Sequence, residues 1–340
     1  MDILITGGNG FTGRHLISAL QERRERVRVL VSPVGDSTWL EQRGVAVFRG
    51  DVRTPDALLA AMRGAEAVFH LVAETKVWGP MRDSYAVNVT GTENVCRAAL
   101  KAGVGRVIHL STFTVYKMMI GRPVTEDDAL APLNEPYSVT KAESDKLVQR
   151  MVRNEHLPAV ILRPGPLLGP GDDRSFGRLA DRVRAGKGII VGSGNNAVPL
   201  TYITDMVQAL LLALDSKHAI GEAYNICNDE PLTQQEYLSA IAQDLGVAAP
   251  HIHVPYLSLY AAAYAFERIS TLSGYRIPAV VTRHGVKILG GDNRISIDKA
   301  RRELGYVPQV CIREGVRLTA AWYRQRDPST KENVNSRKTK

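Results

Sequence analysis

The chain has 340 residues, of which 44% are hydrophobic, so it is long enough to bury the core of one large or two modest domains. Its formal net charge is +8, but much of the excess lies in residues 324–340, which lack apolar periodicity, so the charge does not indicate a nucleic-acid partner. The three cysteines, Cys96, Cys227 and Cys311, are far apart in the sequence, which argues against a disulfide framework and against a metal site. We expect no signal peptide and no transmembrane segment, and the reducing cytoplasm is the expected compartment.

The first segment predicts a strand, a glycine-rich turn and a helix. A short apolar run opens the chain, and after Gly13 the apolar residues recur on one side of a helix. Gly8, Gly10 and Gly13 match the spacing of the dinucleotide fingerprint, and Gly7, Gly10 and Gly13 give a second, regular spacing. Glycines here permit close backbone approach to a pyrophosphate, which the free N–H groups at the helix start stabilise. The turn is therefore predicted to bind a dinucleotide, and a merely structural turn is the alternative.

A second strand is predicted at residues 27–31, and Ser32 directly follows it. An acidic residue at this position would bind the adenosine ribose of NAD, whereas an arginine would accommodate the 2′-phosphate of NADP. Serine can donate to a phosphate and does not repel one, so Ser32 favours NADP(H). Asp36 nearby keeps NAD open.

Further apolar strands alternate with helices along the chain. They are predicted at residues 45–48, 67–72, 107–110 and 159–162, separated by helical segments such as 88–102. This alternation predicts a parallel sheet covered on both faces, an α/β doubly wound fold of the Rossmann type. Such a sheet binds ligands beyond the carboxyl ends of its strands, so the residues that follow each strand are the candidates for the site.

Two polar residues of these strands have alternative roles. Asp51 is predicted either to contact the adenine or to mark a helix start, with neither role favoured. His70 lies inside an apolar strand, so it is predicted to be a packed core histidine rather than a catalytic base.

Tyr137 and Lys141 are predicted to form an acid/base pair. They are four residues apart at the start of a helix, so they share a helix face. A tyrosine pKa is ordinarily about 10, and a nearby ammonium favours the phenolate and lowers that pKa, as hydride transfer to or from an alcohol carbon requires. Ser111 and Thr112 close the preceding strand, and the Thr112 hydroxyl is expected to hold the substrate oxygen.

Taken together, these motifs resemble those of the extended short-chain dehydrogenase/reductases. The resemblance runs in order to about Tyr323 and is carried by residues 6–13, Gly50-Asp51, Ser111-Thr112, residues 137–141, Arg163-Pro164 and residues 169–172. It implies that Tyr137 is the acid/base, that Lys141 tunes it and binds the nicotinamide ribose, and that Thr112 orients the substrate oxygen. Asn88 sits where the family often has a supporting asparagine, and Ser32 departs from both common cofactor patterns. The implied cofactor contacts are Gly7, Gly10, Phe11, Thr12, Gly13, Ser32, Asp51, Val52, Leu71, Ala73, Ser111, Tyr137, Lys141 and Pro164.

The chain is predicted to divide into two domains and a tail. Residues 1–165 form the dinucleotide-binding domain, to which residues 200–228 are expected to return with a strand at 223–226. Residues 166–199 and 229–325 form a smaller C-terminal substrate-binding domain, and residues 326–340 a basic, disordered tail.

The apolar segment 256–272 is too short to span a bilayer. It is predicted to be a packed helix of the substrate domain, with the wall of an apolar substrate pocket or a membrane-surface contact as alternatives. This segment, Trp78-Gly79 and residues 290–293 are most similar to the 3β-hydroxysteroid dehydrogenase-like branch, which includes reductases of long-chain 3-keto acids.

The predicted function is an NAD(P)-dependent oxidoreductase that interconverts a secondary alcohol and a ketone on a small, largely apolar substrate. A nucleotide-sugar epimerase or dehydratase is the rival, and it needs basic residues such as Arg174, Arg178 or Arg283 to converge on a diphosphate. A non-catalytic NAD(P)-binding sensor is a second alternative, although it would not need Thr112, Tyr137 and Lys141 together. The resemblance also implies a homodimer.

Overall fold

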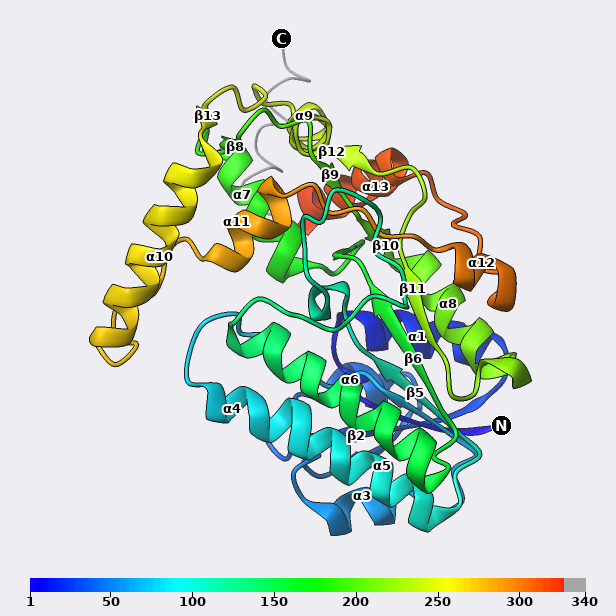
Figure 1. The fold of residues 1–340 in the computed structure, drawn as a ribbon. Coiled ribbons are helices and arrows are strands. Elements are labelled where there is room, and N and C mark those ends of the chain that lie inside the picture. Colours follow the sequence, from blue (N-terminus) through cyan, green and yellow to red (C-terminus); the bar gives the residue numbers. More distant parts are fainter. Residues whose placement is uncertain (327–340) are drawn as a thin grey trace.

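The computed structural model describes residues 1–326 and contains one parallel sheet between layers of helices (Figure 1). The strand order is β11-β6-β5-β4-β1-β2-β3, and every pairing is parallel. The strands are β1 (Asp2–Thr6), β2 (Arg26–Val31), β3 (Ala46–Arg49), β4 (Ala67–His70), β5 (Arg106–Leu110), β6 (Ala159–Pro164) and β11 (Ala223–Ile226). The direction of strand succession reverses between β1 and β4, where a doubly wound sheet binds its ligand. The predicted Rossmann-type fold is confirmed.

Alternate side chains of the strands pack into separate cores on the two faces of the sheet. Ile3 and Ile5 of β1 pack on one face with helices α1 (Phe11–Glu22) and α8 (Ile203–Asp215), whereas Leu4 packs on the other. The second face is covered by α3 (Pro55–Met62), α5 (Gly91–Ala102) and α6 (Pro136–Glu155). Strands β4 and β6 are buried along their whole length, as the continuous apolar runs predicted.

Several strand boundaries differ from the sequence prediction by one or two residues. Strand β4 ends at His70, two residues before the predicted end. The helix expected at residues 88–102 begins earlier, because α4 (Met81–Tyr85) runs through a π-helical turn, η1 (Ala86–Thr90), into α5. Such turns widen a helix locally and are frequent at functional sites.

A second group of elements lies beyond the carboxyl edge of the sheet. Helix α9 (Gln234–Leu245) packs between α7 (Arg178–Arg184) and α13 (Ile312–Arg326). The remaining short elements are α2 (Thr38–Gln42), η2 (Phe113–Val115), β7 (Leu167–Leu168), η3 (Asp173–Gly177), β8 (Ile190–Val191), β9 (Ala197–Val198), β10 (Thr201–Tyr202), η4 (Lys217–Ala219), β12 (Leu232–Thr233), β13 (His253–Val254) and α12 (Asp298–Leu304). The tail predicted at residues 326–340 lies, after Arg326, outside the described residues.

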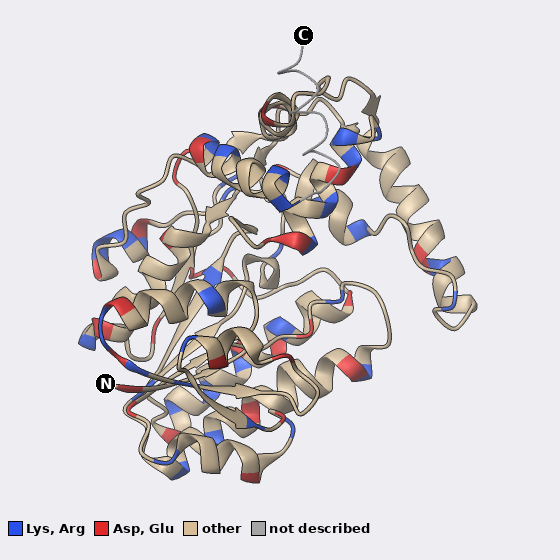
Figure 2. Ribbon diagram, turned by 180° about the vertical axis from the view of Figure 1, so that it is seen from behind, with Lys and Arg blue, Asp and Glu red and all other residues tan. Residues whose placement is uncertain are grey.

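Helix α10 (Tyr256–Leu272) projects from the body of the molecule at the left of Figure 1 and is followed by α11 (Arg283–Gly290). Ala263 of α10 is buried with Val191 and Val286, and Leu259 and Tyr260 pack against them, so the predicted packed helix packs along one side and leaves large apolar side chains exposed on the rest of its surface. Seen from behind in Figure 2, α10 carries little charge along its length. Among residues 1–326, no helix is both long and apolar enough to cross a bilayer.

Candidate active site

The glycine turn after β1 is built by close backbone packing. Gly7 has φ +80°, and a Cβ atom there would lie 2.9 Å from the backbone nitrogen of Val72, in the segment after β4. A Cβ on Gly13 would lie 2.5 Å from the Gly7 carbonyl oxygen. These two glycines are therefore required for the turn itself, and the turn brings the ends of β1 and β4 together.

Gly10 differs, because its outer side is open. It is the N-cap of α1 at φ −80°, and a Cβ there would meet only the Gly7 carbonyl oxygen, at 3.2 Å. No side chain caps this helix end, and its first turn holds no acidic residue. Unpaired amides at a helix start and small residues above them suit an anion, so the turn fits a pyrophosphate.

Phe11 and Thr12 form the first turn of the same helix. A Cβ on Gly171 would lie 3.3 Å from the Phe11 ring, so the loop after β7 packs against the helix start. The imidazole Nε2 of His15 hydrogen-bonds to the Pro170 carbonyl at 2.8 Å in the same contact.

The other predicted cofactor contacts follow the parallel strands at one edge of the sheet. Leu71 and Ala73 follow β4, Ser111 follows β5 and Pro164 ends β6. Val52, which follows β3, is buried against Gly91 of α5. A ligand that touched both the β3 end and the β5 end would have to span the sheet, as an extended dinucleotide does.

Asp51 forms an ion pair with Arg53, 2.7 Å between Arg53 Nη2 and Asp51 Oδ2, and this partner lowers the pKa of the carboxyl group. The N-cap of α3 is Thr54, so the alternative that Asp51 begins a helix is wrong. The adenine contact stays a prediction.

Ser32 is exposed at the end of β2. The nearest acid, Asp36, already accepts hydrogen bonds at Oδ1 from the Thr38 amide, 2.9 Å, and the Thr38 hydroxyl, 2.7 Å. Arg49 reaches the same loop and donates from Nη1 to the Gly35 carbonyl at 2.6 Å. The loop after β2 therefore combines an exposed serine with a neighbouring guanidinium.

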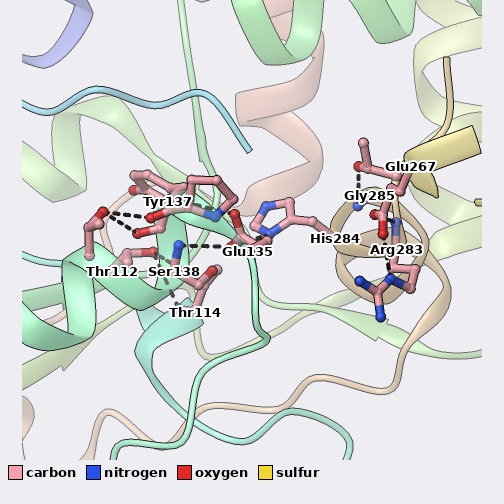
Figure 3. A network of polar contacts seen from close by, with 12 residues as sticks. Thr112, Thr114, Glu135, Tyr137, Ser138, Glu267, Arg283, His284 and Gly285 are labelled. Carbon is pink, nitrogen blue, oxygen red and sulfur yellow. Dashed lines mark hydrogen bonds and ion pairs between the residues drawn. The ribbon is translucent and has the colours of Figure 1, made fainter. Parts of the chain in front are cut away.

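Tyr137 occupies the first turn of α6, where the helix starts with Pro136. The carboxylate of Glu135 caps this helix and accepts the backbone N–H groups of Tyr137, 2.9 Å, and Ser138, 2.8 Å. The Thr112 hydroxyl lies close enough to the Tyr137 phenol to favour its ionised form, so the structure brings these two predicted residues together (Figure 3). Burial raises the pKa of Tyr137 to about 12, which outweighs the lowering by Thr112.

Lys141 lies one turn along α6, and its ammonium donates to the Leu110 carbonyl at 2.7 Å. Burial lowers the pKa of Lys141 to about 8, although the carboxylate of Asp145 acts in the opposite direction. The expectation that Lys141 lowers the pKa of Tyr137 is wrong for this arrangement, because burial of the phenol dominates and the ammonium is directed to a backbone carbonyl.

A buried ion pair lies beneath these residues and was not predicted. Asp145 and Arg163 are almost fully buried and bind each other through two hydrogen bonds, 2.9 and 2.8 Å. Asp145 also accepts from the Ser111 hydroxyl at 2.7 Å, so Ser111 points into this pair. Asp145 lies four residues after Lys141 on the same helix face, and this spacing was the signal that could have identified it.

Asn88 lies in the π-helical turn and donates to the Thr140 hydroxyl of α6 at 2.9 Å. His70 is 1% exposed and sits between the hydroxyls of Thr6, 2.8 Å, and Thr92, 2.9 Å. Burial lowers the pKa of His70 to about 3, so the ring is neutral. The prediction of a core histidine is confirmed.

The C-terminal part of the chain contributes His284, which sequence reasoning missed. Its Nδ1 lies 3.1 Å from Oε1 of Glu135, and its ring lies edge-on to Tyr137 (Figure 3). The preceding residue, Arg283, binds the buried carboxylate of Glu267 on α10, with Nε 2.5 Å from Oε2. His284 and Glu135 are 149 positions apart, and no local sequence pattern could have predicted their contact.

The three arginines that a diphosphate site would require do not share a partner. Arg283 is committed to Glu267, and Arg174 donates to the Thr75 hydroxyl at 3.2 Å. Arg178 is exposed at the start of α7.

The sequence of this chain is similar to those of known enzymes. Residues 3–227 match the NAD dependent epimerase/dehydratase family. A 2-alkyl-3-oxoalkanoate reductase of Stenotrophomonas maltophilia is 34% identical over 94% of this chain and 99% of its own. The 3beta-hydroxysteroid-dehydrogenase/decarboxylase isoform 1 of Arabidopsis thaliana is 31% identical over 93% of this chain and 78% of its own.

Two solved structures share the fold over nearly their full lengths. The crystal structure of gox2253 has a TM-score of 0.81 and 29% identity, covering 95% of this chain and 98% of that one. The dTDP-glucose 4,6-dehydratase DesIV of Streptomyces venezuelae, with NAD and TYD bound, has a TM-score of 0.77 and 27% identity, covering 96% and 98%.

Proposed function

The chain belongs to the NAD-dependent epimerase/dehydratase family, and from this premise we propose that it is a reductase of ketones on largely apolar substrates. The observation that carries the proposal is that Thr112 and Tyr137 lie together, one helical turn from Lys141, at the ligand-binding edge of the sheet. The 2-alkyl-3-oxoalkanoate reductase and the 3beta-hydroxysteroid-dehydrogenase/decarboxylase among its relatives support a hydroxyl or keto group on an apolar body.

The site residues fit a proton transfer to a carbonyl oxygen. When bound, the reduced nicotinamide supplies the hydride for the carbonyl carbon. Tyr137 donates the proton that turns the oxygen into a hydroxyl, and Thr112 holds that oxygen in place. A phenol with a pKa of about 12 keeps its proton at neutral pH, so Tyr137 has a proton to donate in this direction. Lys141, whose pKa is about 8, is positioned to bind ribose hydroxyls and return a proton to Tyr137.

We infer NADP(H) as the preferred nucleotide. Ser32 offers a hydroxyl and no charge, and Asp36, which could bind a ribose, is already bonded to Thr38. Arg49 supplies a positive charge to the loop that would face a 2′-phosphate.

A cytoplasmic homodimer is part of the proposal. All three cysteines are free thiols, which suits a reducing compartment. Helices α5 and α6 pack side by side on one face of the sheet and offer a broad helical surface to a second subunit.

Nucleotide-sugar epimerisation or dehydration is the second candidate, because DesIV, a dTDP-glucose 4,6-dehydratase, shares the fold and the family of this chain includes epimerases and dehydratases. Arg283 is paired with Glu267 and Arg174 binds the Thr75 hydroxyl, so neither of these arginines is free for a diphosphate, and we favour the ketone reductase.

Deuterium transfer tests the proposal. The protein is incubated with NADPH deuterated at the transferred position and a 2-alkyl-3-oxo acid, and the product is examined by mass spectrometry. We expect one deuterium at the new carbinol carbon and one oxidised nucleotide per turnover. Tyr137→Phe should abolish the reaction and retain nucleotide affinity, whereas Tyr85→Phe, at an exposed residue, should react normally. Conversion of a nucleotide-sugar with no net nucleotide oxidation would instead establish the epimerase.

A further inference from the structure

Helix α10 and the segment that follows it carry most of the exposed apolar surface of the described chain. Sixteen large apolar side chains are exposed within residues 1–326, and nine of them lie between Ile252 and Val280. Such a concentration marks an interaction surface rather than scattered surface hydrophobes. We propose that this docking segment, residues 252–280, binds the surface of an anionic lipid bilayer.

Helix α10 exposes several large apolar side chains and fully buries none. Its buried residues, Ala263, Glu267 and Ser270, are small or polar, and the apolar side chains that pack inward, Tyr256, Leu259 and Tyr260, are only partly buried. The exposed side includes Leu257 and Leu272, which are 78% and 82% exposed. A helix at an aqueous surface buries its apolar face and exposes its polar one. The medium that covers the outer face of α10 is therefore apolar.

The charge of this region identifies an anionic partner. Residues 252–280 contain two arginines, Arg268 and Arg276, and one acid, Glu267, which is buried and paired with Arg283. Arg268 and Arg276 are exposed, and no acidic partner contacts them among the described residues. Basic side chains beside apolar ones are the composition that binds anionic headgroups. In a symmetric contact with a second copy, the segment would instead bring like charges together.

The length of α10 fits a helix that lies in the interface. It has 17 residues, and no helix of residues 1–326 is long and apolar enough to cross a bilayer. The Glu267–Arg283 ion pair fastens α10 to α11, where the next residue, His284, contacts Tyr137. A bilayer docked on this segment would lie beside the candidate active site. The docking itself does not depend on the proposed reaction.

The test is sedimentation of the full chain with lipid vesicles, without substrate or nucleotide. We expect binding to phosphatidylcholine vesicles that contain phosphatidylglycerol, weaker binding to pure phosphatidylcholine, and weakening by salt. The double variant Leu257→Glu/Leu272→Glu should raise the apparent dissociation constant at least about tenfold, because two leucines no longer enter the interface. The matched control Ile220→Glu/Val307→Glu places the same charges at exposed apolar residues elsewhere and should bind as the unmodified protein does.

Two outcomes would overturn the proposal. One is that the unmodified protein does not sediment with anionic vesicles, or that the leucine variant binds them equally well. The other is that Leu257→Glu/Leu272→Glu converts a dimer to a monomer in analytical ultracentrifugation without any vesicle binding by the parent, which would assign the segment to a second copy. Arg268→Glu/Arg276→Glu should remove the preference for anionic over neutral vesicles, and an unchanged preference would contradict the role of charge.

Discussion

The imidazole of His284 meets the phenol ring of Tyr137 edge-on, with 6.3 Å between the ring centroids. The same imidazole binds Glu135, the residue that caps the helix on which Tyr137 lies. The C-terminal part of the chain therefore holds the candidate acid from one side, while Thr112 holds it from the other.

Replacement of His284 should affect turnover more than folding. In His284→Ala, Glu135 still accepts the amides of Tyr137 and Ser138, so the helix cap remains. We expect the kcat/KM for the ketone to fall about tenfold, since a small displacement of an acid is costly to catalysis, with nucleotide affinity unchanged. Glu135→Ala, in contrast, should lower the free energy of unfolding by roughly 1 kcal/mol through loss of the cap. Steady-state kinetics and urea unfolding separate the two, and full activity of His284→Ala would remove the positioning role.

Two glycine variants should separate binding from folding. Gly10→Val places a side chain on the open side of the turn, so we expect loss of nucleotide binding in calorimetric titration while the folded structure persists. Gly13→Ala drives a methyl group into the Gly7 carbonyl oxygen, 2.5 Å away, so it should lower the melting temperature. Normal nucleotide affinity in Gly10→Val would show that the pyrophosphate does not lie over this turn.

Ser32→Asp should change the choice of nucleotide. A carboxylate at the end of β2 repels a 2′-phosphate and can accept ribose hydroxyls, so we expect the KM for NADPH to rise at least about tenfold and that for NADH to fall or stay constant. Val34→Asp adds the same charge two residues away at a 97% exposed position and is the control. If both variants keep the parental ratio of KM values, Ser32 does not face the 2′ position.

The buried ammonium of Lys141 predicts a pH-dependent difference in stability. Its pKa is about 8 in the folded protein, lowered by burial from an ordinary 10.5. Between these pH values the unfolded chain binds the proton that the folded protein has released, so stability rises with pH. Relative to Lys141→Met, the parent should therefore gain up to about 3 kcal/mol between pH 8 and 10.5. Chemical denaturation of both proteins across this range measures the difference, which should be constant if Lys141 titrates normally.

Local patterns were sufficient to predict the sheet and the relation of Tyr137 to Lys141. Continuous apolar strands such as β6 are buried in a parallel sheet, and a spacing of four residues places side chains on one helix face. The contact of Thr112 with Tyr137 follows because Thr112 comes after the carboxyl end of β5 and α6, which leads into the next strand β6, begins at the same edge of the sheet. The catalytic roles of these three residues stay predictions.

Other features depend on tertiary contacts that no sequence period encodes. The raised pKa of Tyr137 comes from burial, and the ammonium of Lys141 is directed by the Leu110 carbonyl. His284 reaches Glu135 across 149 positions. Helix α10 was predicted to be packed because its composition is apolar, but only a few of its residues are buried. An apolar composition does not reveal which side of a helix is covered or by what.

The pairing of β11 with β6 bears on how this chain can be synthesised and divided. Strand β6 is buried along its whole length, and one of its edges is covered only by β11, which lies some sixty residues further on. A fragment ending near residue 165 would leave an apolar strand with free backbone N–H and C=O groups, which is a template for aggregation. During translation the same edge stays open until Ile226 has left the ribosome. The nucleotide-binding half is therefore not a module that can be excised or grafted at its apparent boundary.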